Sequence, residues 1–296
     1  MLFAFLSTLL LGATSVAANK SRQAVGPMRA NLGRLLMAFV VLAILSYSLG
    51  RGVSGAGLWF FVLSGGCGIG IGDTAFFAAL PFLGSRLSAM LMQCLAVPTA
   101  IIVEWLWLDT RLHGAQFACI GVVLGGIMIA LMPTRQDPPK VRVRPIGILF
   151  GIIAALGQGL GAVLSRRGFA AADDVSQQMD GFSAALQRNL GGSGLIAAWF
   201  VALHLLKRGE AAPARPRLWS DYRWTATNAL LGPILAMTSM QFALATTPSG
   251  IVLPIMATTP LWVIPFAYWI EGERPSKRSL GGGALAVAGA VGLTLV

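Results

Sequence analysis

The chain has 296 residues, of which 56% are hydrophobic and 11% are charged, and its mean hydropathy is +0.74. Soluble domains usually have about a quarter of their residues charged, so this composition excludes an ordinary soluble fold and indicates lipid as the main surroundings. The net charge of +11 could suggest a nucleic-acid partner. The basic residues stand between apolar runs, however, where they anchor loops, and no nucleic-acid partner is expected.

Apolar runs of about 20 residues have the length of a transmembrane helix and are too long for the strands of a membrane barrel. An all-α polytopic membrane protein is therefore predicted. Its ten predicted spans lie at residues 2–18, 32–49, 57–83, 87–108, 113–132, 146–164, 189–206, 224–246, 249–270 and 279–296.

The first run can also be interpreted as a signal peptide, because SVAA at residues 15–18 resembles a cleavage site. Basic residues do not precede this run, whereas Lys20 and Arg22 follow it directly. A signal peptide has the opposite arrangement, so we interpret the first run as a span.

A proline-rich, charged segment, PTRQDPPKVRVRP, separates the first five predicted spans from the last five. Such a composition is typical of a linker. The predicted organisation is a five-helix unit at residues 1–133, a linker at 134–145 and a second five-helix unit at 146–296.

The two halves echo one another at an offset of 164 residues, which aligns Ala79 and Leu80 with Ala243 and Leu244, and Gly125 with Gly289. A unit of five helices ends on the opposite side of the membrane from its start, so the second copy is predicted to be inverted. In carriers built from inverted repeats, the substrate site lies between the repeats.

Lysine and arginine are distributed unevenly between the two sides of the predicted spans. Seventeen follow odd-numbered spans, and five follow even-numbered ones, namely Arg51, Arg111, Arg166, Arg167 and Arg188. Cytoplasmic loops carry the excess of these residues. A multi-pass protein of the plasma or inner membrane with both termini outside is therefore predicted.

Short motifs stand at corresponding places in the two halves. They are TPSG (247–250), Pro260, EGERP (271–275), GGG (281–283) and Gly289 in the second half, and Gly72, Asp73, Pro98 and Gly125 in the first. With these motifs the chain resembles the EamA-type branch of the drug/metabolite transporter superfamily. The first half departs from the family at LDTRL (108–112), where a Glu-Arg pair is usual.

The resemblance implies a ten-helix secondary carrier, usually an exporter of metabolites or amino acids. It also implies a central cavity lined mainly by helices 1, 3, 4, 6, 8 and 9. Since no ATP-binding motif is present, uphill transport by such a carrier would use a gradient or exchange.

Asp73 is the strongest candidate for a functional residue. Placing a carboxylate inside a membrane span costs about 3 kcal/mol, and such a residue usually faces a cavity or a partner. It follows Gly65, Gly66, Gly68, Gly70 and Gly72. These glycines favour either close helix packing or local unwinding near a substrate. Asp73 itself is expected either to bind a neighbouring helix or Arg86, or to bind substrate or a proton.

Glu104 lies near the end of the fourth predicted span, between Val103 and Trp105. It can act as a proton site, or it can reach the membrane interface beside Asp109. The interfacial interpretation is the favoured one.

Uncharged polar side chains lie well inside two later spans, namely Gln158, Thr238 and Gln241. Their amide and hydroxyl groups can bind a substrate or form hydrogen bonds between helices. Together with Asp73 and Glu104 they complete the set of candidate substrate-binding or coupling residues.

Prolines interrupt the fourth and ninth predicted spans and remove helical hydrogen bonds there. Pro98, Pro254, Pro260 and Pro265 are therefore candidate bending points.

Catalysis finds no support in the sequence, which contains no His/Asp/Glu cluster, nucleophile elbow or metal motif. Cys67, Cys94 and Cys119 lie in apolar runs without the spacing of metal ligands. Neither enzyme activity nor a metal or other cofactor is expected. The expected partners are a small-molecule substrate and membrane lipids, with the protein a monomer or homodimer. The alternative to a transporter is an integral membrane enzyme or a lipid-handling protein.

Overall fold

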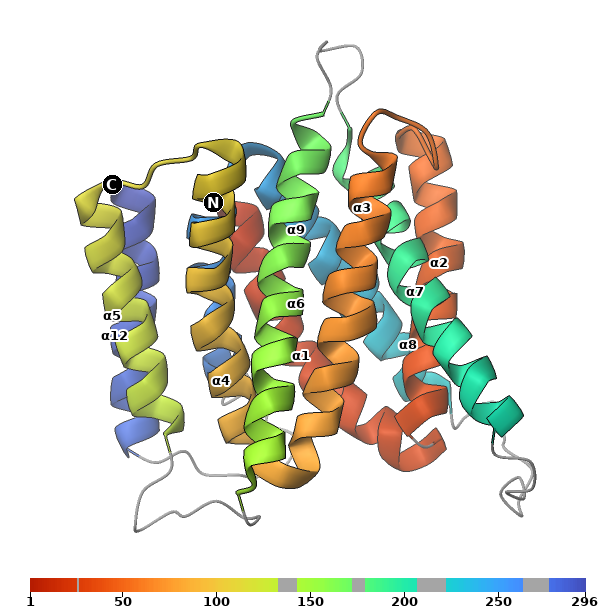
Figure 1. Cartoon of the computed structure of the whole chain (residues 1–296), viewed down its shortest axis with the longest axis horizontal. Helices are drawn as coiled ribbons and strands as arrows, with labels where there is room; N and C mark the ends of the chain where they lie inside the picture. Colours follow the sequence, from red (N-terminus) through yellow and green to blue (C-terminus); the bar gives the residue numbers. More distant parts are fainter. Residues whose placement is uncertain (26, 133–142, 172–178, 207–221, 263–276) are drawn as a thin grey trace.

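The computed structural model describes residues 1–25, 27–132, 143–171, 179–206, 222–262 and 277–296. These residues form helices and short connections, with no strand among them, and the helices run up and down through one bundle (Figure 1). Seven helical segments are long and apolar enough to cross a membrane. The prediction of an all-α, multi-pass membrane protein is confirmed at this level.

The helices of the first half alternate in direction, and the N- and C-termini lie at the same end of the bundle, at the top of Figure 1. The α4 helix contributes to two candidate spans, Leu58–Leu83 and Leu87–Leu108. The elements of this half are α1 (Leu2–Val25), α2 (Pro27–Leu49), α3 (Leu58–Gly65), the π-helix η1 (Gly66–Asp73), α4 (Thr74–Leu108) and α5 (Gly114–Leu131).

The second half repeats the up-and-down course. The α9 helix follows α8 and η4 without a break, and α12 packs beside α5 (Figure 1). Its elements are α6 (Pro145–Phe169), α7 (Gly181–Leu206), α8 (Arg223–Ala229), the π-helix η4 (Leu230–Ala236), α9 (Met237–Thr246), α10 (Ser249–Ala257) and α12 (Lys277–Leu295).

Local sequence signals explain several helix ends. Pro145 begins α6 after an extended Arg144, a position where the missing N–H of proline costs nothing. The side chain of Gln116 accepts a hydrogen bond of 2.9 Å from the backbone N–H of His113 before α5. At the end of α4, Asp109 adopts the left-handed conformation with φ of 48°, which reverses the chain.

The spans agree with the sequence prediction in part. Segments 2–18, 189–206 and 249–270 are not among the seven candidate spans, so the count of ten stays a prediction. The described parts of the first and last of these are the shorter apolar helices Leu2–Thr14 and Ser249–Trp262. The α7 helix begins at Gly181, eight residues earlier than predicted.

This earlier start corrects the charge count, which treats Arg188 as a loop residue. Arg188 lies inside α7 and is only 1% exposed. Two further arginines of the count have largely buried side chains inside helices, namely Arg166 of α6 at 21% exposure and Arg34 of α2 at 18%, the latter one of the seventeen that follow odd-numbered spans. The excess of basic residues stays on the same side without these three.

The two π-helices stand at equivalent positions of the two halves. An offset of 164 residues carries Gly66 of η1 onto Leu230 of η4, and Asp73 onto Met237. In η4, Pro233 lacks the N–H that a regular α-helix requires. In η1, four glycines remove side chains that would hold a regular helix. Such π-segments are frequent at functional sites.

The glycines of α5 and α12 bring these two helices into backbone contact. A Cβ atom on Gly126 would lie 2.5 Å from the backbone nitrogen of Ala286, and one on Gly282 would lie 2.6 Å from the nitrogen of Ala130. Further along, a Cβ on Gly289 would lie 2.9 Å from the nitrogen of Val123. Small residues permit this approach in membrane proteins, where packing drives association.

We predict that Gly126→Ala lowers stability by about 1–3 kcal/mol, because the new methyl group would overlap backbone atoms of α12. The adjacent Gly125 has open space at its Cβ position. Gly125→Ala is the matched control and should leave stability unchanged or slightly raised. Thermal unfolding of the purified variants in detergent measures both. Equal melting temperatures for the two variants would contradict the close packing.

Candidate functional site

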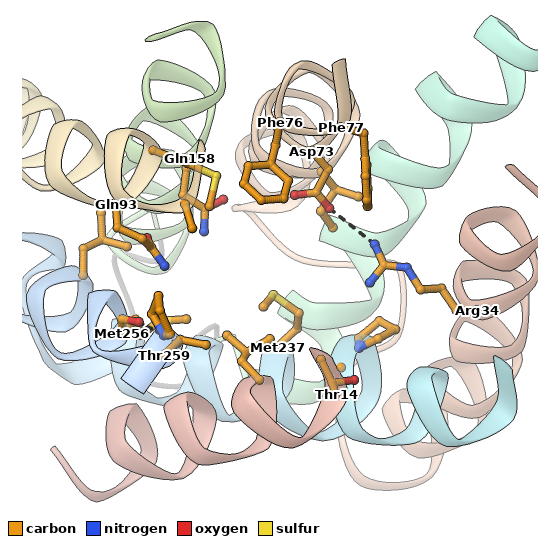
Figure 2. Close-up of a pocket in the computed structure, with 18 of the residues that line it drawn as sticks. Thr14, Arg34, Asp73, Phe76, Phe77, Gln93, Gln158, Met237, Met256 and Thr259 are labelled. Atoms are coloured by element: carbon orange, nitrogen blue, oxygen red, sulfur yellow. Dashed lines mark hydrogen bonds and ion pairs between the residues drawn. The ribbon is translucent and has the colours of Figure 1, made fainter. Parts of the chain in front are cut away.

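A cavity of about 480 Å³ lies in the interior of the bundle (Figure 2). It is lined by residues of α1, α2, η1, α4, α5, α6, η4, α9 and α10, and by Thr259 and Pro260 beyond α10. Most of the wall is apolar, with Phe76, Phe77 and Met237 among its residues. A mostly apolar cavity with a few convergent polar groups is typical of a small-molecule site.

Asp73 and Arg34 form an ion pair on one side of this cavity. The Nη2 atom of Arg34 lies 3.4 Å from Oδ2 of Asp73, and the two side chains are 18% and 35% exposed. The Nε of Arg34 also donates to the side-chain oxygen of Asn31 at 2.8 Å. Arg34 therefore keeps its place through Asn31 while its outer nitrogens face Asp73 and the cavity (Figure 2).

The glycines before Asp73 bring η1 close to α6 and α7. At the end of α3, a Cβ on Gly65 would overlap the carbonyl oxygen of Arg188 in α7, and in η1 a Cβ on Gly72 would lie 3.4 Å from the carbonyl oxygen of Ala154 in α6. The close packing that these glycines predict is present, whereas local unwinding is not seen in this segment. The helices pack closely, and the backbone departs from a regular α-helix without unwinding.

Arg188 lies behind η1 and is fully buried. Its Nη1 donates to the hydroxyl oxygens of Ser64 at 3.0 Å and Ser165 at 3.2 Å, and to the carbonyl oxygen of Gly161 at 3.4 Å. Its Nε has no hydrogen-bond partner among the described residues. Asp73 interacts electrostatically with both Arg188 and Arg34.

Gln158 lies on the side of the cavity opposite Arg34, together with Gln93 (Figure 2). Glycines flank Gln158 on both sides. A Cβ on Gly157 would lie 2.7 Å from the carbonyl oxygen of Cys67, and one on Gly159 would lie 2.8 Å from that of Ala96. These contacts hold α6 against both η1 and α4, which sets Gln158 between them.

Gln241 and Thr238 do not line this cavity. Gln241 is 0% exposed, and neither its amide nitrogen nor its amide oxygen has a hydrogen-bond partner among the described residues. The hydroxyl of Thr238 is likewise without one there. The structure separates both residues from the group formed by Asp73, Gln158 and Arg34.

Glu104 is also away from the cavity, and it does not reach the membrane interface beside Asp109. The favoured interpretation is wrong, because Glu104 is 2% exposed. It lies 3.4 Å from Nε of Arg166 and accepts hydrogen bonds from the hydroxyl of Ser249 and the backbone N–H of Gly250. Buried partners from α6 and α10 compensate the charge of this carboxylate, although its Oε1 has no hydrogen bond among the described residues.

Arg166 extends this network to the end of α9. Its Nη1 donates to the carbonyl oxygen of Leu244 at 2.8 Å and to that of Ala245 at 3.2 Å. The pair therefore joins α4, α6, α9 and α10 at one end of the bundle. Asp109, by contrast, is exposed and lies 3.5 Å from an exposed Arg111.

The candidate bending prolines lie in different surroundings. Pro98 lies inside α4 and Pro254 inside α10, whereas Pro260 lines the cavity. Pro265 lies outside the described residues. The side chain of Arg86, the alternative partner of Asp73, is also outside what the structure describes.

Comparisons with known proteins identify the family and the fold of the chain. The EamA-like transporter family matches residues 1–132 and 145–295. The chain belongs to the EamA-like transporter family. This family is part of the drug/metabolite transporter superfamily and consists of transporters rather than enzymes. The resemblance inferred from the short motifs is confirmed.

A solved structure, titled only "Crystal structure of protein", has the same fold. Its TM-score is 0.74 at 19% sequence identity, with 99% of this chain and 96% of that chain covered. At this identity the likeness shows the fold alone. The search of curated proteins finds no match.

Three residues of the site were missed in the sequence. The sequence prediction counts Arg34 and Arg188 with the loop residues because each stands at the edge of an apolar run, and it does not single out Gln93. The position of Arg34 and Arg188 at the edge of an apolar run is the signal that could identify them, since charged residues in spans usually face a partner or cavity.

We predict that Glu104→Ala destabilises the protein by about 3 kcal/mol, because it leaves the guanidinium of Arg166 without its carboxylate. Glu104→Ala combined with Arg166→Met should restore much of the loss. The exposed pair gives the control, since Asp109→Ala should cost less than about 1 kcal/mol. Thermal unfolding in detergent measures all three. An unchanged melting temperature for Glu104→Ala would show that the buried pair contributes nothing.

Proposed function

We propose that this protein is a secondary transporter that moves small organic solutes across the plasma membrane by alternating access. The observation that carries the proposal is the cavity inside the bundle, with an ion pair on one side, two amides on the other and an apolar wall between them. Charged groups placed inside a membrane bundle are expensive and mark substrate or ion pathways.

Two inverted five-helix units, with ten spans in all, are part of this proposal. It is supported by the two π-helices 164 residues apart, the first of which ends with Asp73 and the second of which is followed by Met237, both on the cavity wall. The two ranges matched by the family model fall on the two predicted units. Both termini at one end of the bundle are consistent with an even number of spans (Figure 1).

The described contacts suggest how one end of the cavity is closed. Glu104, Arg166 and Ser249 join α4, α6 and α10 near the end of the bundle that holds the termini. The excess of Lys and Arg predicts that this end faces outside. We infer that the structure represents a state closed to the outside, with the cavity nearer the cytoplasmic end.

Within this proposal Asp73, Arg34, Gln158 and Gln93 bind the solute, and opening at the α4–α10 contact releases it outside. Export is the direction expected for the family. The substrate is a small molecule, and the surrounding partners are membrane lipids. No specific feature of the described residues favours an enzyme or a lipid-handling protein.

We predict that Met92→Trp abolishes solute flux, because an indole placed on the cavity wall occupies the space a solute needs. Purified protein in liposomes, tested with a panel of amino acids, sugars, nucleosides and organic acids, provides the measurement. Met128→Trp on the exposed face of α5 is the control and should transport normally. Flux that persists in Met92→Trp, or none at all in the wild type, argues against the proposal.

We further predict that cross-linking α4 to α10 blocks transport. A Cβ on Gly250 would lie 3.9 Å from the Cα of Ile101, which is within reach of a disulfide. In a protein without its native cysteines, Ile101→Cys with Gly250→Cys should lose flux on oxidation and regain it on reduction. Each single variant is the control. Full flux in the oxidised protein would show that this contact does not open during transport.

A further inference from the structure

The charges in and behind the cavity do not balance among the described residues. Glu104 and Arg166 neutralise each other at the closed end of the bundle. Arg34, Asp73 and Arg188 remain, which amounts to two guanidinium groups and one carboxylate.

Arg188 cannot relieve this imbalance by moving into water. It is 1% exposed and lies in the interior of the bundle, where its partners are two serine hydroxyls and a carbonyl. Neutral partners orient a guanidinium but do not cancel its charge. A buried, uncompensated charge is costly in a low-dielectric interior, and among the described residues Asp73 is the carboxylate that interacts electrostatically with Arg188.

Arg34 is the more available of the two cations. Its contact with Asp73 is a single one of 3.4 Å through Nη2, which is long for an ion pair with a hydrogen bond. Both residues line the cavity. The bond from Nε to Asn31 holds Arg34 in place, so an anion in the cavity can replace Asp73 without moving the arginine. Asp73 would then remain compensated by Arg188.

We propose that the solute of this cavity is an organic anion with a single carboxylate or sulfonate head and an apolar body. The head binds Arg34 and supplies the missing negative charge. The body packs against Phe76 and Phe77, which flank Asp73, and against Met237 (Figure 2). This inference rests on the proposed transport function and names its substrate class.

A zwitterion or a cation suits these charges less well. An ammonium group at Asp73 would compete with Arg34, which is already paired with that carboxylate, and it would add to the positive charge of Arg34 and Arg188. Repulsion between like charges is stronger in a membrane interior than in water. The charge of the head, rather than the shape of the body, should therefore decide binding.

The test uses the full chain, purified in detergent and reconstituted in liposomes, with probes that share one body. The probes are 3-phenylpropanesulfonate, 3-phenylpropionate, phenylalanine and 3-phenylpropyltrimethylammonium. The sulfonate keeps its charge and does not leak through lipid as a neutral acid. We expect the two anions to raise the melting temperature saturably and to be transported, and the other two to do neither. Preference for phenylalanine or the ammonium probe would overturn the inference.

Variants of the Arg34–Asp73 pair distinguish binding of the solute at Arg34 from binding at Asp73, because the two alternatives predict opposite changes in sulfonate affinity. Asp73→Asn removes the competitor for Arg34 and should tighten sulfonate binding several-fold. Arg34→Gln should weaken it on the order of tenfold or more, while Arg51→Gln, an exposed arginine outside the cavity, should not change it. Loss of sulfonate binding in a folded Asp73→Asn protein would overturn the inference, because it would make Asp73 the binding group.

The same assay separates this inference from the proposed function. If the wild type transports cations, zwitterions or neutral solutes but no anion, the substrate class is wrong and the transport function stands. If it transports none of these probes and nothing from the broad metabolite panel, both proposals fail.

Discussion

The structure depends on one constraint, which is that charge inside an apolar layer must be satisfied by the protein itself. Lipid offers no hydrogen bonds, so each interior ionisable group requires a partner from another helix. Glu104 meets this requirement with Arg166, Ser249 and Gly250, and Arg188 meets it in part with two serines and a carbonyl. These contacts fix which helices lie together, and they leave Arg34 and Asp73 facing the cavity.

Glycine makes these partnerships geometrically possible. The approach of α3 to α7 at Gly65 and of α5 to α12 at Gly126 leaves no room for a side chain. Where packing rather than the hydrophobic effect holds helices together, such contacts supply the association energy. Gly72 beside Asp73, and Gly157 and Gly159 beside Gln158, likewise lie against neighbouring helices, so glycine packing also positions the two residues of the cavity.

The two halves share a fold but differ in chemistry. Both have a π-helix that ends at the cavity, yet the first ends in Asp73 and the second is followed by Met237. Charge is likewise confined to one side of the cavity. An apolar wall with a single charged corner is suited to solutes with one ionic head, and this asymmetry underlies the substrate class that we propose.

The sequence by itself determined the membrane character, the helical class and the family, because hydropathy, run length and short motifs are local properties. It also identified Asp73 and Gln158, which lie on the cavity. Only the tertiary structure decided that Glu104 has buried partners, that Gln241 and Thr238 lie elsewhere, and that Arg34 and Arg188 are interior. Arg34 is 39 residues from Asp73 and Ser249 is 145 from Glu104. The physical reason is that a charge in lipid is stabilised by whichever helix packs against it, and packing joins residues far apart in the chain.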